Sequence, residues 1–193
     1  RTGSERAVAR TELKIGGFGG QGVILSGIIV GKAAALHDGK HATLIQAFGP
    51  ESRGGACSAQ VVLSDEEIAY PYVRRPDVLV VMSEEAYRKF RPELREGGLL
   101  VVEEDLVSLD ERDRGRAHFA VPATRMPEAM GRRIVANIVM VGFLTAVWGL
   151  VSREAAERAV YDSVPRGTGE FNLEAFDRGY RAGLDKAGRA PAG

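Results

Sequence analysis

The sequence predicts an α/β fold of three layers, α/β/α, in which a mostly parallel, mixed sheet lies between two layers of helices. Short apolar runs alternate with segments of helical periodicity along the 193 residues, which is the pattern of strand–helix units. Residues 78–82 (VLVVM) carry no polar side chain, as is typical of a strand buried on both faces. The chain also has a Rossmann-like start, in which a short apolar strand leads through a glycine-rich turn into a helix.

The predicted strands are short runs rich in Val, Ile and Leu that lie between turn-forming residues. They cover residues 13–18, 41–47, 57–63, 78–82, 99–103 and 117–121. Residues 67–70 form a further β-like segment, and no helix fits between them and residues 57–63. We therefore expect these two segments to form a local antiparallel pair.

The predicted helices follow from apolar periodicity and from capping residues at their starts. Residues 23–36 follow the glycine-rich turn, and Ser83 caps a helix that runs to about residue 90. The C-terminal helices are expected at 134–148, at 152–162 with Ser152 as cap, and at 172–187 with Asn172 as cap.

We expect a single domain over residues 11–187, with a flexible N-terminal extension at 1–10 and a flexible tail at 188–193. Residues 134–151 are uncharged and just long enough to suggest a membrane span, but their polar and glycine positions favour a buried core helix. Residues 1–10 are polar and of mixed charge, unlike a secretory signal. The expectation is therefore a cytoplasmic protein without a membrane partner.

The charge balance and the cysteine count exclude several classes of function. The 26 basic and 26 acidic side chains give zero formal charge, so the composition gives no basis for binding nucleic acid or anionic lipid. The single Cys rules out internal disulfides, an iron–sulfur cluster held by four cysteines and a cysteine-based zinc site. The 24 glycines, in contrast, exceed the usual share of about 7%, so their positions matter.

The first glycine cluster matches G-x-G-x-x-G between a predicted strand and a predicted helix. Its residues are Gly17, Phe18, Gly19, Gly20, Gln21 and Gly22. Glycine permits positive φ and close approach of a ligand, and amides at a helix N-terminus can face an anion. An NAD site also needs an acid at the end of the second strand, but Asp38 precedes that strand, and Val23 stands where a P-loop needs Lys. Two interpretations stay open: a bound nucleotide or phosphate, or a structural turn or partner contact.

The second glycine-rich loop covers residues 48–56 and follows the second predicted strand. Because the carboxyl ends of strands in an open α/β sheet meet at one edge, we expect Glu51, Ser52, Arg53 and Gly54 to lie near the first loop. Arg53 offers a bidentate fork for carboxylate or phosphate, and Glu51 could orient it. The alternative is a Gly/Pro turn whose charged side chains are solvated or paired locally.

The other polar candidates are expected to have structural roles. Cys57 has no histidine nearby in the sequence and should be an inert core residue. Residues 103–105 should form a solvated loop or a helix N-terminus, and residues 110–116, which mix both charges, should face water. Asn137 needs a hydrogen-bond partner if its apolar helix is buried.

Several of these segments together resemble the gamma subunit of the 2-oxoacid:ferredoxin oxidoreductases. The matching segments, in order, are 19–23 (GGQGV), 48–55 (FGPESRGG), 64–68 (SDEEI) with Tyr70-Pro71, and 76–80 (PDVLV) with Met82-Ser83. The resemblance covers about residues 15–103 and is specific because four modest motifs occur in the right order. GPESRGG and LSDEEIAYP are most similar to the 2-oxoglutarate branch of the family.

The resemblance implies a subunit of a complex that oxidatively decarboxylates a 2-oxoacid, forms acyl-CoA and reduces ferredoxin. In this family thiamine diphosphate and Mg²⁺ are bound by the alpha and beta subunits, and 4Fe–4S clusters lie in beta or in a ferredoxin-like delta chain. We expect no catalytic residue and no metal in this chain alone, and no activity without its partners. Our hypothesis for a coenzyme A or active-site edge comprises Gly17, Gly19, Gly20, Gln21, Gly22, Glu51, Ser52, Arg53 and Gly54.

Two other functions remain as alternatives at this point. One is a self-sufficient Rossmann-type oxidoreductase that uses NAD(P), against which the missing acid after the second strand counts. The other is an assembly scaffold that binds no ligand, with both loops serving only as partner contacts.

Overall fold

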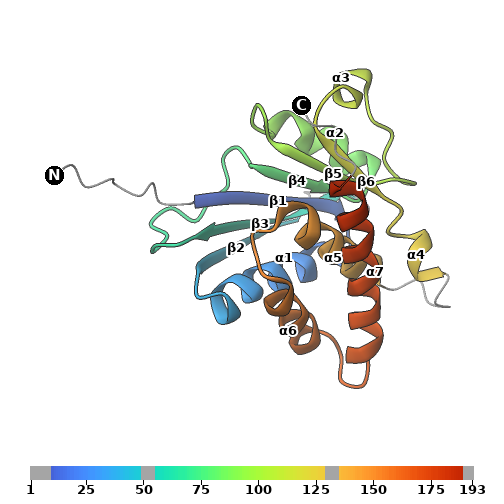
Figure 1. Ribbon diagram of the computed structural model, residues 1–193. Coiled ribbons are helices and arrows are strands. Elements are labelled where there is room, and N and C mark those ends of the chain that lie inside the picture. Colours follow the sequence, from blue (N-terminus) through green and yellow to red (C-terminus); the bar gives the residue numbers. More distant parts are fainter. Residues whose placement is uncertain (1–9, 49–54, 129–134, 189–193) are drawn as a thin grey trace.

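The computed structural model describes residues 10–48, 55–128 and 135–188, in which a six-stranded sheet has the order β2-β3-β1-β4-β5-β6 (Figure 1). Its strands are β1 (Arg10–Phe18), β2 (His41–Ala47), β3 (Ala56–Ser64), β4 (Val78–Val81), β5 (Leu99–Glu103) and β6 (His118–Val121). The pairs β1–β4, β4–β5 and β5–β6 are parallel, whereas β3 runs antiparallel to both β1 and β2. The prediction of a mostly parallel, mixed sheet is confirmed.

The antiparallel partner predicted for residues 57–63 is wrong. β3 pairs with β1 and β2, and residues 67–70 form no strand. Side chains of the sheet hold the segment after β3 instead: Arg10 Nη1 donates to the Tyr70 carbonyl at 2.8 Å, and Thr43 Oγ1 donates to the Pro71 carbonyl at 3.3 Å. Strand propensity in a short segment could not reveal that more distant strands already occupy both edges of β3.

Helices cover both faces of the sheet and complete the three predicted layers (Figure 1). One face carries α1 (Val23–Lys32), which continues as a π-helix at Ala33–His37, together with α5 (Ala136–Trp148), α6 (Arg153–Ser163) and α7 (Gly169–Ala187). The other carries α2 (Glu84–Phe90), followed by a 3₁₀ turn at Arg91–Glu93. Two short helices, α3 (Glu111–Arg114) and α4 (Arg125–Glu128), lie in the connections around β6.

The β4 strand is buried on both faces, as its apolar sequence predicts. Val78 and Val80 belong to the larger core beneath α1, α5 and α7, while Leu79 and Val81 belong to the smaller core beneath α2. None of the four side chains is more than 1% exposed. The apolar run therefore reflects a central position in the sheet.

Three element starts differ from the prediction by two residues or more. β1 begins at Arg10, the last residue of the expected extension, and α5 begins at Ala136. α7 begins at Gly169, so Asn172 is not the cap of this helix. Asn172 lies inside the first turn, and its Nδ2 donates to the Thr168 carbonyl at 2.9 Å. An Asn one turn into a helix and an Asn at its cap look alike in a sequence, because both bond to backbone groups of the same turn.

Two glycines bring α5 and α7 into backbone contact. A Cβ built on Gly142 would overlap the carbonyl oxygen of Phe176, and a Cβ on Gly179 would overlap that of Val139. The expected core helix is thus confirmed as a buried element whose close packing requires glycine. Within the described ranges, no helix has the length and apolar character needed to cross a membrane.

Candidate functional site

The turn between β1 and α1 has a backbone shape that glycine adopts most easily. Gly20 has φ of 89° and Gly22 has φ of 75°, both in the left-handed region. No atom of the described chain lies within 4 Å of a Cβ built on Gly19 or Gly20. No described residue therefore covers the outer side of the loop, at the carboxyl end of β1.

Gln21 uses both ends of its amide inside this loop. Its Oε1 accepts the Phe18 N–H at 2.7 Å, and its Nε2 donates to the Met82 carbonyl at 2.9 Å. Since Met82 directly follows β4, these bonds join the carboxyl ends of two neighbouring parallel strands. In this structure Gln21 fixes the shape of the loop.

The first backbone amides of α1, at the same edge, have no acceptor among the described residues. Gly22 is the N-cap, no described side chain caps the helix, and the first N–H bonded within the turn is that of Ser26, to the Gly22 carbonyl at 2.9 Å. Amides of the first helical turn have no acceptor within the helix, and the helix dipole gives this end a partial positive charge. The geometry is compatible with an anion but does not by itself identify one.

Asn137 of α5 adjoins the loop from the side, which the sequence did not predict. Its Nδ2 lies 3.5 Å from the Gly22 carbonyl, and a Cβ on Gly22 would lie 2.5 Å from its Cγ. The side chain is buried at 5% exposure. In the sequence, Asn137 stood out as a single amide side chain in an otherwise apolar helix. The structure shows that its hydrogen-bond partner is the glycine loop.

The second loop begins and ends at the same edge of the sheet. Phe18 is opposite Ala56, and Ala47 is opposite Ser58, so the carboxyl ends of β1 and β2 lie on either side of the start of β3. Two strand spacings put the ends of β1 and β2 about 10 Å apart. Glu51, Ser52, Arg53 and Gly54 lie outside the described residues, and their positions stay a prediction.

Two exposed phenylalanines lie at this edge. Phe18 at the end of β1 is 38% exposed, and Phe48 just after β2 is 72% exposed. Exposed phenylalanines beside an open glycine loop are typical of a surface that another chain covers.

Asp38 does not occupy the position that a dinucleotide site requires. It lies before β2, and its carboxylate accepts the Ser152 N–H at 2.6 Å and the Ser152 hydroxyl at 2.7 Å. Ser152 is the predicted cap of α6, and its Oγ in turn accepts the Ala155 N–H at 3.1 Å. Asp38 therefore stabilises a helix start at the opposite edge of the sheet, which weakens the NAD(P) alternative.

Cys57 is confirmed as a core residue. It lies in β3 at 6% exposure, and burial raises the pKa of its thiol. A thiol with a raised pKa is a poor nucleophile at neutral pH. In the part of the chain that the structure describes, no three His, Cys, Asp or Glu side chains form a group that could hold a metal ion.

The acidic segment after β5 is only partly solvated, contrary to the prediction. Glu103 is fully buried, and its carboxylate accepts the N–H groups of Asp105, Leu106 and Thr124 at 2.9, 2.7 and 3.2 Å. Burial raises the pKa of Glu103, although these N–H bonds oppose the shift. Glu103 therefore ties together the connections that follow β5 and β6.

The prediction that residues 110–116 face water is wrong for one residue. Asp113 is 3% exposed, and it bonds to Tyr87 and Arg91 beneath α3. The mixed charges of the segment gave no signal of this pairing, because both partners lie more than 20 residues earlier in the chain.

Comparison with known proteins places the fold and the sequence in one family. The family model described as pyruvate ferredoxin/flavodoxin oxidoreductase matches residues 12–182. The 2-oxoglutarate synthase subunit KorC of Methanocaldococcus jannaschii is 49% identical over 91% of this chain and 95% of its own length. The pyruvate synthase subunit PorC of the same organism is 30% identical over 92% of this chain and 99% of its own length.

Two solved structures have the same fold. The gamma subunit of a keto/oxoacid ferredoxin oxidoreductase from Geobacter sulfurreducens has a TM-score of 0.82 and 39% identity, over 92% of this chain and 98% of that chain. A 2-oxoglutarate:ferredoxin oxidoreductase from Magnetococcus marinus, with 2-oxoglutarate, coenzyme A and succinyl-CoA bound, has a TM-score of 0.81 and 25% identity. It matches 92% of this chain but only 31% of that longer chain.

Proposed function

The chain belongs to the pyruvate ferredoxin/flavodoxin oxidoreductase family, and from this premise we propose that it is the gamma-type subunit of a 2-oxoglutarate:ferredoxin oxidoreductase. The reaction is the oxidative decarboxylation of 2-oxoglutarate to succinyl-CoA and CO₂, with reduction of ferredoxin. The observation that carries the proposal is 49% identity, over nearly the whole of both chains, to a 2-oxoglutarate synthase subunit.

The choice of 2-oxoglutarate rests on the difference between relatives. Within one organism, the 2-oxoglutarate synthase subunit is 49% identical to this chain, whereas the pyruvate synthase subunit of similar coverage is 30% identical. Assay of the assembled enzyme with each oxoacid tests this choice. We expect kcat/KM to be at least about tenfold higher for 2-oxoglutarate than for pyruvate, and a preference for pyruvate contradicts it.

The chain works with partner subunits. In the Magnetococcus enzyme the matching region is 31% of one longer chain, so there this fold is covalently joined to further parts of the enzyme. In the present protein we propose that separate alpha and beta subunits, with a ferredoxin-like delta chain, supply those parts. The exposed Phe18 and Phe48 at the carboxyl edge support a covered surface there.

The thiamine diphosphate, Mg²⁺ and iron–sulfur clusters of the complex are proposed to lie in those partners. Thiamine diphosphate supplies the electron sink for decarboxylation, and the clusters carry single electrons to ferredoxin. With one Cys, this sequence lacks the thiolates that a 4Fe–4S cluster needs. The part of this chain would be to complete and shape the edge of the site.

Coenzyme A is the ligand we propose for the carboxyl edge. The open loop at Gly19 and Gly20, the uncapped start of α1, and Arg53 on the second loop together offer backbone donors and one cation to a phosphate. Gln21 and Asn137 hold the glycine loop in place and are not proposed as ligands.

Kinetics of the assembled enzyme test this role. Arg53→Ala should raise the KM for coenzyme A at least about fivefold and leave the KM for 2-oxoglutarate unchanged. Arg75→Ala is the matched control, because Arg75 is exposed just before β4, at the opposite edge. An unchanged KM for coenzyme A in Arg53→Ala, with weaker subunit association instead, would favour the scaffold alternative at this edge.

A further inference from the structure

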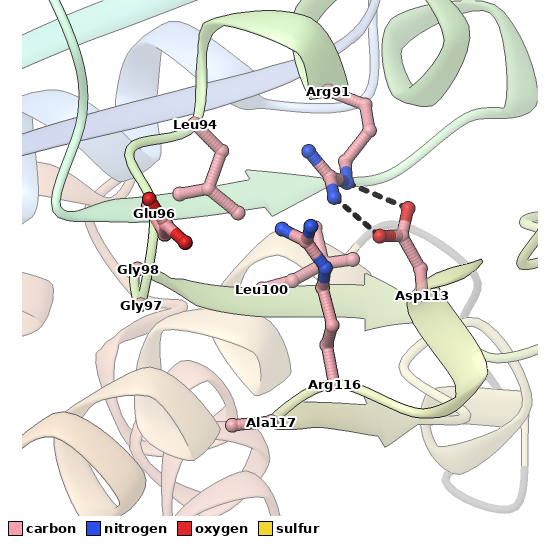
Figure 2. A pocket seen from close by; sticks show the side chains of 9 residues that line it. All are labelled: Arg91, Leu94, Glu96, Gly97, Gly98, Leu100, Asp113, Arg116 and Ala117. Carbon is pink, nitrogen blue, oxygen red and sulfur yellow. Dashed lines mark hydrogen bonds and ion pairs between the residues drawn. The ribbon is translucent and has the colours of Figure 1, made fainter.

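A second concave site lies at the amino-terminal edge of the sheet, opposite the glycine loop. It is a cavity of about 300 Å³ in front of β5 and β6 (Figure 2). Two arginines, Arg91 and Arg116, line it together with Asp113 and Glu96. Its remaining walls are apolar or glycine: Leu94, Gly97, Gly98, Leu100 and Ala117.

Arg91 is fixed in this cavity by buried partners. Its Nε donates to Asp113 Oδ2 at 2.6 Å, and its Nη2 donates to Asp113 Oδ1. The Tyr87 hydroxyl donates to the same Oδ2 at 2.6 Å and itself accepts the Asp110 N–H at 3.1 Å. Asp113 is 3% exposed, so the guanidinium is held by a carboxylate that is itself fully engaged. Side chains locked in this way lose little entropy when a ligand binds.

The Arg91 guanidinium keeps donors that Asp113 does not use. In Figure 2 Asp113 approaches Arg91 from one side, and the third nitrogen of the guanidinium, Nη1, points away from it. The N–H groups on Nη1 and the second one on Nη2 have no acceptor among the described residues. In Figure 2 Nη1 lies on the side of the cavity on which Leu94 lies.

Arg116 brings a second cation to the same space without a carboxylate of its own. Figure 2 shows its guanidinium pointing into the cavity beside that of Arg91. Among the residues that the structure describes, Arg116 forms no ion pair, and Asp113 is already bidentate with Arg91. The two guanidiniums share one carboxylate, that of Asp113, so this part of the cavity carries an excess positive charge. A further anionic oxygen group would balance that charge.

The other walls of the cavity favour a ligand that has one anionic group and an apolar remainder. Leu94 and Leu100 are buried at 7% and 3% exposure and form an apolar surface beside the arginines. Gly98 lets Leu94 pack closely against the start of β5, because a Cβ there would lie 2.6 Å from Leu94 Cδ1. Glu96 lies on the wall across from the arginines and would repel a second negative group (Figure 2).

We propose that this cavity binds a carboxylate or phosphate group carried on a short apolar body, with the anionic oxygens between Arg91 and Arg116. The group can come from a free small molecule or from an acidic side chain of a partner subunit, and the chemistry is the same for both. The site does not depend on the proposed function, because it lies at the opposite edge of the sheet and its first test uses the isolated chain.

Butyrate is a suitable probe, and its neutral isostere butyramide is the control ligand. Titration of the isotope-labelled isolated chain, followed by amide NMR shifts, should give saturable shifts around residues 91–98 and 113–117 with butyrate and none with butyramide. Arg116→Gln should weaken butyrate binding at least about fivefold. Glu96→Gln should strengthen it, because a repulsive charge is removed.

Arg112→Gln is the matched control variant. Arg112 lies four residues before Arg116, in the short helix α3, and is exposed, but it does not line the cavity. Arg116 is also exposed, so both variants should fold with unchanged thermal midpoints. Arg91 is unsuitable as the first variant, because its removal would leave the buried Asp113 without its cation.

A second arm distinguishes the two sources of the anion. If butyrate does not bind, but Arg116→Gln and not Arg112→Gln weakens association with the co-expressed partner subunits at least about fivefold, the anion is a partner carboxylate. The proposal is overturned if Arg116→Gln changes neither binding nor association, or if Arg112→Gln has the same effect as Arg116→Gln.

Discussion

Gln21 and Met82 are joined by a hydrogen bond of 2.9 Å, from the side-chain amide of the glycine loop to the carbonyl at the end of β4. The other end of the same amide accepts the Phe18 N–H. The loop proposed to face coenzyme A is thus positioned by Gln21, whose amide oxygen and amide nitrogen are both already hydrogen-bonded.

Gln21→Glu should distort the loop without changing its glycines. The variant replaces a donor by a carboxylate oxygen next to the Met82 carbonyl, at a cost of about 1–2 kcal/mol of unfolding free energy. In the assembled enzyme the KM for coenzyme A should rise more than the KM for 2-oxoglutarate. Gln46→Glu, at an exposed position of β2, should change neither constant. Equal changes in both KM values would argue against a role of the loop in binding coenzyme A.

Gly142→Ala should destabilise the protein strongly. The added methyl group would overlap the Phe176 carbonyl and force α5 and α7 apart, at a cost of about 2–3 kcal/mol in a denaturant titration. Gly31→Ala in α1 is the control, because nothing lies within 4 Å of a Cβ there. That variant should be neutral or stabilising by up to about 1 kcal/mol, since alanine favours helix. Similar losses in both variants would contradict the close approach of α5 and α7.

Asp113→Asn should lower the free energy of unfolding by about 3 kcal/mol, because it removes the buried charge that pairs with Arg91. Burial alone would raise the pKa of Asp113, but Arg91 and Tyr87 outweigh burial and lower it. A lowered pKa in the folded state means that the contribution is present at neutral pH and is lost as the pH falls through that pKa.

Urea titrations between pH 7 and pH 3 check this sign. The difference in unfolding free energy between the wild type and Asp113→Asn should shrink as the pH falls. Glu174→Gln, which removes an exposed pair with Arg178, should change stability by no more than about 0.5 kcal/mol at any pH. A difference for Asp113→Asn that grows with acid would reverse the sign and refute the assignment.

Tyr87 should ionise at unusually high pH. Burial, followed by its hydrogen bond to Asp113, raises the pKa of Tyr87 from 10.0 to about 12. Because the folded state holds this proton more tightly, the stabilisation is complete below pH 10 and is lost as the pH rises toward 12. Absorbance of tyrosinate during alkaline titration should show one of the five tyrosines with a late midpoint, absent in Tyr87→Phe. An unchanged titration curve in Tyr87→Phe would show that the late group is another tyrosine.

Much of the fold was predictable from local pattern. The apolar runs gave the strands, and Ser83 and Ser152 marked two helix starts because their hydroxyls accept the N–H groups of Ala86 and Ala155. The partner of β3 was not predictable, because pairing is a property of the whole sheet and residues 67–70 have the right composition for a strand. The true start of α7 was hidden for a similar reason, since Asn172 bonds to the helix start from within it.

The position of the glycine loop at the carboxyl ends of the strands was predictable, but its internal contacts were not. The rule that carboxyl ends of strands share an edge brought the ends of β1 and β2 together correctly. The internal bonds of Gln21 and the contact of Asn137 with Gly22 depend on β4 and α5, which lie far along the chain. The Arg91–Asp113 pair joins residues 22 apart across a turn, a strand and a short helix, so the local charge pattern could not reveal it.

Reconstitution of the enzyme from its separately expressed subunits, with and without this chain, tests the proposed function most directly. We predict that the full set reduces ferredoxin only when 2-oxoglutarate and coenzyme A are both present, that omission of this chain abolishes the reaction, and that adding it back restores it. Full 2-oxoglutarate-dependent activity of the partners alone, or nicotinamide-dependent activity of this chain by itself, would contradict the account.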